Sequence, residues 1–266
     1  MMGKLDFNNK WIVVTGASSG LGEALAIKLA SKEGANLIIA ARRKEKLDSL
    51  KSRIQSEFKR EVIVIESDLS DPGSVENLFR ESTGKKEVFG IINNAGMTDF
   101  NPADIKDFEK YEKIIEVNLK ALIKLSLLFL DYFKKKGEGA ILNITSMGAF
   151  FPLVYQAAYS ASKHGAQVFT EILSKENKNK NITISSFAPG GIATEMLSSS
   201  GLDKLRGADD PFNWSAEKVA KKAISSFKRK KLLSVPGLVY KLGLILKRIL
   251  PRKTLLYFLE KSYRKK

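Results

Sequence analysis

Cysteine is absent from this chain, and histidine occurs only once, as His164, among 266 residues. The lack of thiols excludes disulfides, thiolate chemistry and cysteine-ligated metal sites. One histidine with no second one nearby gives little support to a metal site or a Ser–His dyad. An ordinary helix position explains His164 better, so we expect no metal.

Acidic residues are scarce, because 29 Asp and Glu stand against 45 Lys and Arg, for a net charge of +16. This balance favours an anionic partner, whether nucleic acid, an acidic membrane or a phosphorylated ligand. Residues 1–9 are polar and lack the apolar region of a signal peptide, so we expect a cytoplasmic location. A chain of this length that is 44% hydrophobic can bury a sizeable core, and we expect one domain with a tail.

Tyr159 and Lys163 fall four residues apart in an Ala-rich segment, 157–173, which predicts a helix. At that spacing the two side chains share a face, and the ammonium favours the phenolate, which lowers the phenol pKa from its reference of about 10. A phenol tuned in this way exchanges a proton with a carbonyl or an alcohol near neutral pH. Ser146, at the end of a predicted buried strand, is placed to donate to the same oxygen. Such a pair also occurs on many ordinary helices, so alone it decides nothing.

The N-terminal region predicts a strand, a glycine-rich turn and a helix in succession. The strand is Lys10–Val14, the turn is Thr15–Gly22 with the spacing Gly-x-x-x-Gly-x-Gly, and the helix is Glu23–Ser31. This order brings backbone N–H groups and the positive end of a helix dipole to a pyrophosphate. A glycine-rich turn alone is weak evidence, but here both flanking elements are present.

Two arginines, Arg42 and Arg43, follow the second predicted strand, Asn36–Ala41. In a dinucleotide-binding unit, an acidic residue at this point would select NAD through the ribose 2′-hydroxyl. Guanidinium groups instead match a 2′-phosphate, which they bind bidentately and with opposite charge. We favour this interpretation for Arg42. For Arg43 an equal alternative is that it opens the basic, solvated helix of residues 44–59.

Strands and helices alternate along the next part of the chain. Strands are expected at 61–66 and 88–92, and helical periodicity runs over 74–81 and 108–133. The alternation predicts an α/β fold, a Rossmann-like doubly wound parallel sheet with helices on both faces and right-handed crossovers. Asn118 lies among apolar residues, where an unpaired amide would cost about 1 to 3 kcal/mol, so it should have a hydrogen-bond partner.

Several short motifs occur in a fixed order: Thr15-Gly16-Ala17-Ser18-Ser19-Gly20-Leu21-Gly22, Asp68, Asn93-Asn94-Ala95-Gly96, Asn118, Ser146, Tyr159-Ser160-Ala161-Ser162-Lys163 and Pro189-Gly190 to Thr194. In order and in spacing they resemble the motifs of the short-chain dehydrogenase/reductase family. The resemblance covers roughly residues 8–230. It implies an oxidoreductase that uses a nicotinamide cofactor.

The resemblance also implies residue roles. Tyr159 would be the acid/base, Lys163 would lower its pKa and hold the nicotinamide ribose, and Ser146 would bind the reacting oxygen. Asn118 would anchor a water that links Lys163 to solvent. With the two arginines added, the expected cofactor contacts are Gly16, Ser18, Ser19, Gly20, Leu21, Gly22, Arg42, Arg43, Asp68, Leu69, Asn94, Ala95, Gly96, Tyr159, Lys163, Pro189, Gly190, Ile192 and Thr194. Gly191 departs from the family pattern, in which a bulkier residue is common.

Residues 195–214 are rich in Ser, Gly and Asp and predict a loop, which in the family covers the substrate. Candidates for an apolar pocket are Met196, Leu197, Leu202, Trp214, Phe150, Phe151, Leu153 and Tyr155. For any single one, an ordinary core or lid contact is the better explanation. Collectively they indicate a hydrophobic substrate.

Half of the net charge lies in residues 232–266, where nine basic residues stand against Glu260 to give +8. Apolar runs separate these charges, but Pro236 and Pro251 cut them well short of the 18 or so residues that a spanning helix needs. We expect this tail to lie on an anionic membrane, at its inner face, without crossing it. An equally weighted alternative is that its apolar face packs on the catalytic domain or on a second subunit. Nucleic acid ranks below both, because no recognition motif accompanies the charge.

The sequence therefore predicts a catalytic domain, residues 1–231, followed by a basic amphipathic extension, residues 232–266. The predicted activity is the NADP(H)-dependent interconversion of a ketone or aldehyde and an alcohol on a hydrophobic, lipid-like substrate, by a homodimer or homotetramer. The competing class is a non-catalytic nucleotide-binding or membrane-associated interaction protein that keeps the fold. The intact set Asn118, Ser146, Tyr159 and Lys163 argues against it.

Overall fold

The computed structural model describes residues 3–178, 181–192, 195 and 214–264. Within these residues the centre of the molecule is a seven-stranded, fully parallel sheet of order β3-β2-β1-β4-β5-β6-β7. Its strands are β1 (Trp11–Thr15), β2 (Asn36–Ala41), β3 (Val62–Glu66), β4 (Val88–Asn93), β5 (Gly139–Ile144), β6 (Ile182–Phe187) and β7 (Leu233–Ser234). The predicted fold class, a Rossmann-like doubly wound parallel sheet, is confirmed.

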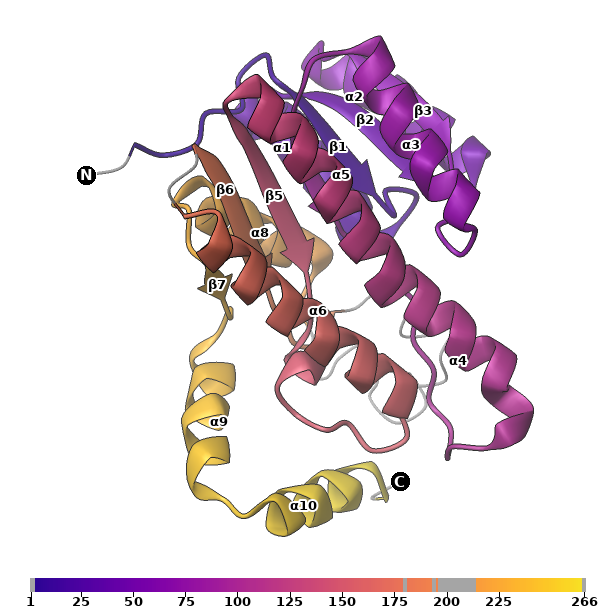
Figure 1. Ribbon diagram of the computed structural model, residues 1–266, viewed down its shortest axis with the longest axis vertical. Coiled ribbons are helices and arrows are strands. Elements are labelled where there is room, and N and C mark those ends of the chain that lie inside the picture. The colour runs from indigo at the N-terminus through magenta and orange to yellow at the C-terminus, as the bar shows by residue number, and fades with distance from the viewer. Residues whose placement is uncertain (1–2, 179–180, 193–194, 196–213, 265–266) are drawn as a thin grey trace.

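Helices cover both faces of the sheet, with α5 and α6 crossing the near face in Figure 1 and α8 behind it. The helices are α1 (Gly20–Glu33), α2 (Lys44–Phe58), α3 (Pro72–Lys85), α4 (Phe108–Ile115), α5 (Ala121–Lys136), α6 (Ala157–Glu176), α8 (Ala216–Lys228), α9 (Leu238–Ile249) and α10 (Arg252–Arg264). Two short 3-10 turns are η1 (Ile105–Asp107) and η3 (Met147–Ala149), and a π-helical turn is η2 (Glu116–Lys120).

The strands are apolar along almost their whole length because both faces of the sheet are covered. Successive side chains of a strand point to opposite faces. Ile12 and Val14 of β1 therefore pack in the core formed with α1, α2 and α8. Trp11 and Val13, one residue out of step, pack in the core formed with α3, α5 and α6.

The helix boundaries follow local chemistry that the sequence only partly reveals. The helix α1 begins at Gly20, before the predicted start at Glu23, and ends at Gly34, whose φ of 67° is left-handed. The helix α3 begins at Pro72, and the Asp71 carboxylate caps it by accepting from the N–H groups of Gly73 and Ser74. The apolar period over 108–133 predicts continuous helix, whereas the π turn η2 separates α4 from α5.

The strand order reverses direction at β1, which pairs with β2 on one side and with β4 on the other. Ligands of open α/β sheets bind in the crevice outside the carboxyl ends of the strands at such a point. Thr15 and Asn94 join the two strand ends here, because the backbone N–H groups of Asn94 and Ala95 both donate to Thr15 Oγ1 at 3.0 Å. The fold therefore places the glycine turn beside the Asn93–Gly96 motif.

The sheet continues into the segment predicted as an extension. The strand β7, which lies within 232–266, pairs with β6 through Leu233 and Ser234. After it, α9 leads away from the sheet and α10 turns across below it (Figure 1). Among the described residues, no helix has both the length and the hydropathy that crossing a bilayer requires.

Candidate active site

A cavity of about 590 Å³ opens along the carboxyl ends of the strands. Its lining contains every predicted cofactor residue that the structure describes: Gly16, Ser18, Ser19, Gly20, Leu21, Gly22, Arg42, Arg43, Asp68, Leu69, Asn94, Ala95, Gly96, Tyr159, Lys163, Pro189, Gly190 and Ile192. Ser146 also lines it. Thr194 lies outside the described residues. Motifs that are spread over 177 positions of the sequence, from 16 to 192, therefore line a single cavity.

The glycine turn brings the backbone of α1 close to that of β1. A Cβ at Gly22 would overlap the carbonyl oxygen of Gly16, so only glycine permits this approach. Gly16 and Gly20 have φ values of 66° and 57°, which favour glycine for a second reason. The first turn of α1, where N–H groups have no intrahelical acceptor, borders the cavity through Ser19, Gly20 and Leu21. This arrangement fits a pyrophosphate.

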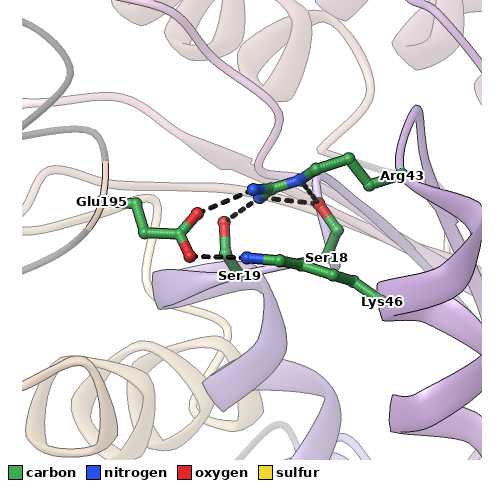
Figure 2. Close-up of polar contacts among 5 residues, drawn as sticks. All are labelled: Ser18, Ser19, Arg43, Lys46 and Glu195. Atoms are coloured by element: carbon green, nitrogen blue, oxygen red, sulfur yellow. Dashed lines mark hydrogen bonds and ion pairs between the residues drawn. The ribbon is translucent and has the colours of Figure 1, made fainter.

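Arg43 is the arginine that reaches the glycine turn, as Figure 2 shows. Its guanidinium donates to Ser19 Oγ at 2.7 Å and to Ser18 Oγ at 3.2 Å, and it pairs with the Glu195 carboxylate at 2.8 Å. Lys46 donates to the other oxygen of the same carboxylate at 2.6 Å. Hydrogen bonds from Lys46 and Arg43 lower the pKa of Glu195 to about 2, so the group is anionic at ordinary pH. The cluster of Ser18, Ser19, Arg43 and Lys46 thus holds an anion.

Lys46 is a residue that the sequence did not single out. It lies one helical turn after Arg43, at the start of α2, and both side chains point to Glu195 (Figure 2). Arg42, which the sequence favours as the phosphate ligand because it follows β2 directly, also lines the cavity. Its charge acts on Asp68. Burial opposes the ionisation of Asp68, yet hydrogen bonds from Ser70 and the Arg42 charge outweigh it and lower the pKa of Asp68.

Lys163 is buried, with only 4% of its surface exposed. Its ammonium donates to the carbonyl oxygen of Ile144 at 3.1 Å and lies 5.9 Å from the centre of the Tyr159 ring. Burial lowers the pKa of Lys163 from 10.5 to about 8. The two residues therefore meet in the cavity with Lys163 in a poorly solvated position, where its charge is felt strongly.

Ser146 lies beside Tyr159 across the Gly148 backbone. A Cβ at Gly148 would come within 3.1 Å of the Tyr159 ring and 3.4 Å of Ser146 Oγ. Ser146 Oγ accepts the N–H of Gly148 at 3.0 Å, which leaves its own proton to donate to an oxygen in the cavity. The carboxyl end of β5 and the first turn of α6 thus place a donor next to a phenol.

Asn118 has the hydrogen-bond partners that its burial requires, as the sequence argument expected. Its amide donates to Met97 O at 2.8 Å and to Ser162 Oγ at 3.1 Å, and its oxygen accepts the N–H of Met97 at 2.8 Å. It is completely buried within the π turn η2, a distortion that often re-aims a side chain at a functional site. Gly96 lies between Asn118 Oδ1 and Lys163 Nζ, which would be 3.2 and 3.5 Å from a Cβ there.

The part of the cavity beyond Ser146 is more apolar. Phe151 and Leu153 line it, as predicted from their position between Ser146 and Tyr159. Phe150 instead packs with Met147 and Val235, and Tyr155 packs edge-on against Phe100. Trp214 packs against the core that contains α8. Met196, Leu197, Leu202 and most of the predicted 195–214 loop lie outside the described residues.

Four lining residues come from the C-terminal helices and were not predicted. They are Val239, Tyr240 and Gly243 of α9 and Leu259 of α10. From the sequence, these positions are predicted to belong to an extension beyond the catalytic domain. The inner side of α9 therefore packs on the catalytic domain, which is one of the alternatives that the sequence left open.

The lining as a whole fits a dinucleotide. Helix N-terminal N–H groups lie near the glycine turn, and cations lie beside Ser18. A phenol, a hydroxyl and a buried ammonium lie together in the same cavity. Residues that could hold such a cofactor and residues that could move a proton are therefore contiguous.

Comparison with known proteins gives a consistent result. The family model described as short chain dehydrogenase matches residues 10–204. The very-long-chain 3-oxoacyl-CoA reductase of Anas platyrhynchos is 33% identical over 200 residues, which are 73% of this chain and 64% of the relative. The human 17-beta-hydroxysteroid dehydrogenase type 3 is 31% identical over 189 residues, 70% of this chain and 60% of the relative. The matched region thus spans about three fifths of the length of these curated relatives.

Among solved structures, a short-chain dehydrogenase from Sphingobium yanoikuyae in complex with NADPH superposes with a TM-score of 0.81 at 26% identity. That match covers 93% of this chain and 95% of the other. The family model, the relatives and the shared fold together show that this chain belongs to the short-chain dehydrogenase family.

Proposed function

We propose that this protein is an NADP(H)-dependent oxidoreductase that interconverts a carbonyl and an alcohol on a hydrophobic, lipid-like substrate, with Tyr159 as the acid/base. The observation that carries the proposal is that Tyr159, Lys163 and Ser146 line the same cavity as the glycine turn and Arg43. A nicotinamide cofactor bound there supplies or accepts the hydride. Family membership supports this chemistry class.

The chain's own residues handle the proton. Tyr159 donates it to the substrate oxygen in the reducing direction and removes it in the oxidising direction. Ser146 holds the same oxygen through its hydroxyl, since its Oγ already accepts the N–H of Gly148. Lys163 stabilises the phenolate. Asn118, which faces Lys163 across Gly96, would hold a water molecule through which Tyr159 regains its proton.

The proposed preference for NADP(H) rests on the cluster Ser18, Ser19, Arg43 and Lys46. This cluster already holds the Glu195 carboxylate with two cations and borders the glycine turn. A 2′-phosphate carries more charge than a carboxylate and offers three acceptor oxygens, so it suits the same donors. The NADPH complex of the Sphingobium yanoikuyae relative supports the choice.

The proposed substrate class rests on the apolar lining by Phe151, Leu153, Val239 and Leu259. It is supported by two relatives whose names specify a very-long-chain 3-oxoacyl-CoA and a 17-beta-hydroxysteroid as substrates. The acyl chain of the first and the ring system of the second are bulky and apolar, and both compounds react at a carbonyl or a hydroxyl.

We further propose that the protein forms a homodimer or homotetramer. The support is a group of exposed apolar side chains, Leu127 on α5 and Val168 and Ile172 on α6. The two α6 residues lie one turn apart, and α5 contacts α6, so the three side chains lie on neighbouring helices. An exposed apolar patch of this kind commonly marks a protein interface.

The test of the activity is Tyr159→Phe, which removes the hydroxyl and keeps the ring. We expect kcat to fall by about 10² to 10⁴, the usual contribution of a general acid. NADPH binding, measured by fluorescence titration, should change little. The matched control is Tyr132→Phe, a partly buried tyrosine that packs against Phe79 and Phe133 and whose change should leave turnover intact. Wild-type turnover by the Tyr159→Phe protein would support the non-catalytic alternative.

A further inference from the structure

The C-terminal helices form part of the cavity wall. The hydroxyl end of the Tyr240 ring lies against Gly190, where a Cβ would overlap it, and the hydroxyl accepts the N–H of Gly191 at 3.3 Å. Phe151 approaches Gly243 so closely that a Cβ there would lie 3.4 Å from its ring. The inner side of α9 thus touches both the Pro189–Ile192 segment, which carries expected cofactor contacts, and the apolar end of the cavity.

The outer side of α9 is apolar and exposed. Leu238, Leu242, Ile245 and Ile249 follow the spacing i, i+4, i+7, i+11, which places them along one stripe of the helix. Their exposed fractions are 77%, 64%, 58% and 76%. On α10, Tyr257 and Phe258 are also more than half exposed. A concentration of large apolar side chains on two adjoining helices is far more than the scattered exposure that is normal on a protein surface.

Basic side chains accompany this apolar stripe. The tail residues with described side chains carry six cations, Lys241, Lys247, Arg248, Arg252, Lys253 and Lys261, against the single carboxylate of Glu260. Exposed apolar residues rimmed by lysine and arginine match an anionic bilayer, in which acyl chains take the apolar groups and headgroups take the charges. The helices have 12 and 13 residues, so they suit a position in the membrane plane.

A second copy of this chain is a poorer occupant of the same surface. In a two-fold dimer the same patch meets itself, so the cations of one tail would face those of the other. Like charges brought together in this way oppose association. An anionic bilayer satisfies both the apolar stripe and its charge.

We propose that α9 and α10 dock on an anionic phospholipid bilayer, so that the apolar end of the cavity opens at the membrane surface and hydrophobic substrate enters from the lipid. The inner side of the tail forms part of the cavity wall, and the outer side binds the membrane. The docking surface consists of Leu238, Leu242, Ile245, Ile249, Tyr257 and Phe258 with their flanking cations. The route of substrate entry rests on the proposed function, whereas docking does not.

Vesicle flotation of the full-length protein tests the docking without any need for turnover. The wild type should float with phosphatidylcholine vesicles that contain phosphatidylserine and much less with phosphatidylcholine alone. Binding should fall between about 0.15 M and about 1 M salt, where the screening length drops from about 8 to about 3 Å.

Two double variants separate the apolar and the charge contributions. We expect vesicle binding to weaken at least tenfold in both, namely in Leu242→Gln with Ile249→Gln and in Lys241→Gln with Arg248→Gln. For the charge variant, the expectation follows because a single basic residue near an anionic leaflet changes binding about fivefold. For the apolar variant, it follows because two exposed apolar groups are lost from the buried face. The matched controls are Ile105→Gln with Phe108→Gln, which are exposed apolar residues outside the tail, and Lys106→Gln with Lys134→Gln. Both controls should bind vesicles as the wild type does.

Kinetics test the entry route. None of the substituted residues lines the cavity, so kcat/KM on a short, water-soluble carbonyl should stay within about twofold of wild type. Only the two tail variants should lose kcat/KM on a long-chain carbonyl embedded in anionic vesicles. A wild type that ignores anionic vesicles overturns the proposal, and so do tail variants that bind normally. If the wild type ignores vesicles and the Leu242→Gln/Ile249→Gln variant also loses an oligomer, the stripe is a subunit interface.

Discussion

If the site prefers NADP(H) as proposed, replacement of Arg43 by Ala should abolish that preference. Arg43 contacts Ser18, Ser19 and an anion at once, so its removal takes away a charge-assisted hydrogen bond to the 2′-phosphate and the partner that orients the two serines. Such a bond contributes about 1.5 to 3 kcal/mol. At about 1.4 kcal/mol for each factor of ten, the Kd for NADPH should rise about 10- to 100-fold. The Kd for NADH should change by less than about threefold, because NADH has no phosphate for the guanidinium to bind.

Glu195→Gln perturbs the same cluster in the opposite direction. The carboxylate pairs with both Arg43 and Lys46, so it competes with an incoming phosphate for the same cations (Figure 2). Its neutralisation should lower the Kd for NADPH several-fold and leave the Kd for NADH unchanged. Isothermal titration of the purified proteins with each cofactor measures both effects.

Arg42→Ala is the matched control, since it removes an adjacent guanidinium that also lines the cavity. The structure pairs Arg42 electrostatically with Asp68, so its loss should affect NADPH by only a few-fold. Equal losses of NADPH and NADH affinity in Arg43→Ala would refute the reasoning. A larger NADPH effect from Arg42→Ala than from Arg43→Ala would restore the interpretation based on the strand end.

Two further predictions concern stability. The folded pKa of Lys163, about 8, lies below its unfolded value of 10.5, so the folded state holds fewer protons between these pH values and its stability should rise with pH over that window. Relative to Lys163→Met, the cofactor-free wild type should gain up to about 3 kcal/mol in urea denaturation between pH 8 and pH 10.5, and parallel curves would contradict the burial argument. Gly190→Ala should cost about 1 to 3 kcal/mol by crowding Tyr240, and most of that loss should vanish in a Tyr240→Ala background; an unchanged loss would mean that Gly190 meets another obstacle.

The sequence predicts the fold well because its local signals agree with one another. Apolar runs of five or six residues alternate with helical periods, and the glycine turn follows the first strand directly. The predicted site residues meet because the carboxyl ends of parallel strands lie at one edge of a sheet. Neither conclusion needs knowledge of distant contacts.

Features that depend on contacts remote in sequence could not be predicted in the same way. The apolar period over 108–133 looks like one helix, and only hydrogen bonds from Asn118 to Met97 and Ser162 reveal why a π turn interrupts it. Lys46 looks like one more solvated lysine on a basic helix, because its anionic partner, Glu195, is 149 positions away. Periodicity and composition carry no information about such pairs.

The glycine pair Gly190 and Gly191 is the point where the tail contacts the Pro189–Thr194 motif. A pair of glycines, Gly190 and Gly191, leaves an edge of the cavity without side chains, at a position where the family commonly has a bulkier residue. Tyr240 occupies that edge: its ring takes the space of a Gly190 side chain, and its hydroxyl receives the Gly191 N–H. A side chain from α9 thus covers the backbone of Gly190 and Gly191.

The contact between Tyr240 and the glycine pair connects the tail to the active-site cavity as well as to the proposed membrane surface. Because Tyr240 of α9 covers this backbone, movement of α9 would uncover the edge between Pro189 and Ile192, which borders the cavity. A surface that holds α9 in place therefore also keeps the Pro189–Ile192 edge covered, while the proposed entry of substrate is at the apolar end of the cavity. The exposed stripe of α9 that would meet a membrane and the tyrosine that covers this edge belong to the same 12-residue helix, so the proposed docking and the cavity wall depend on one element.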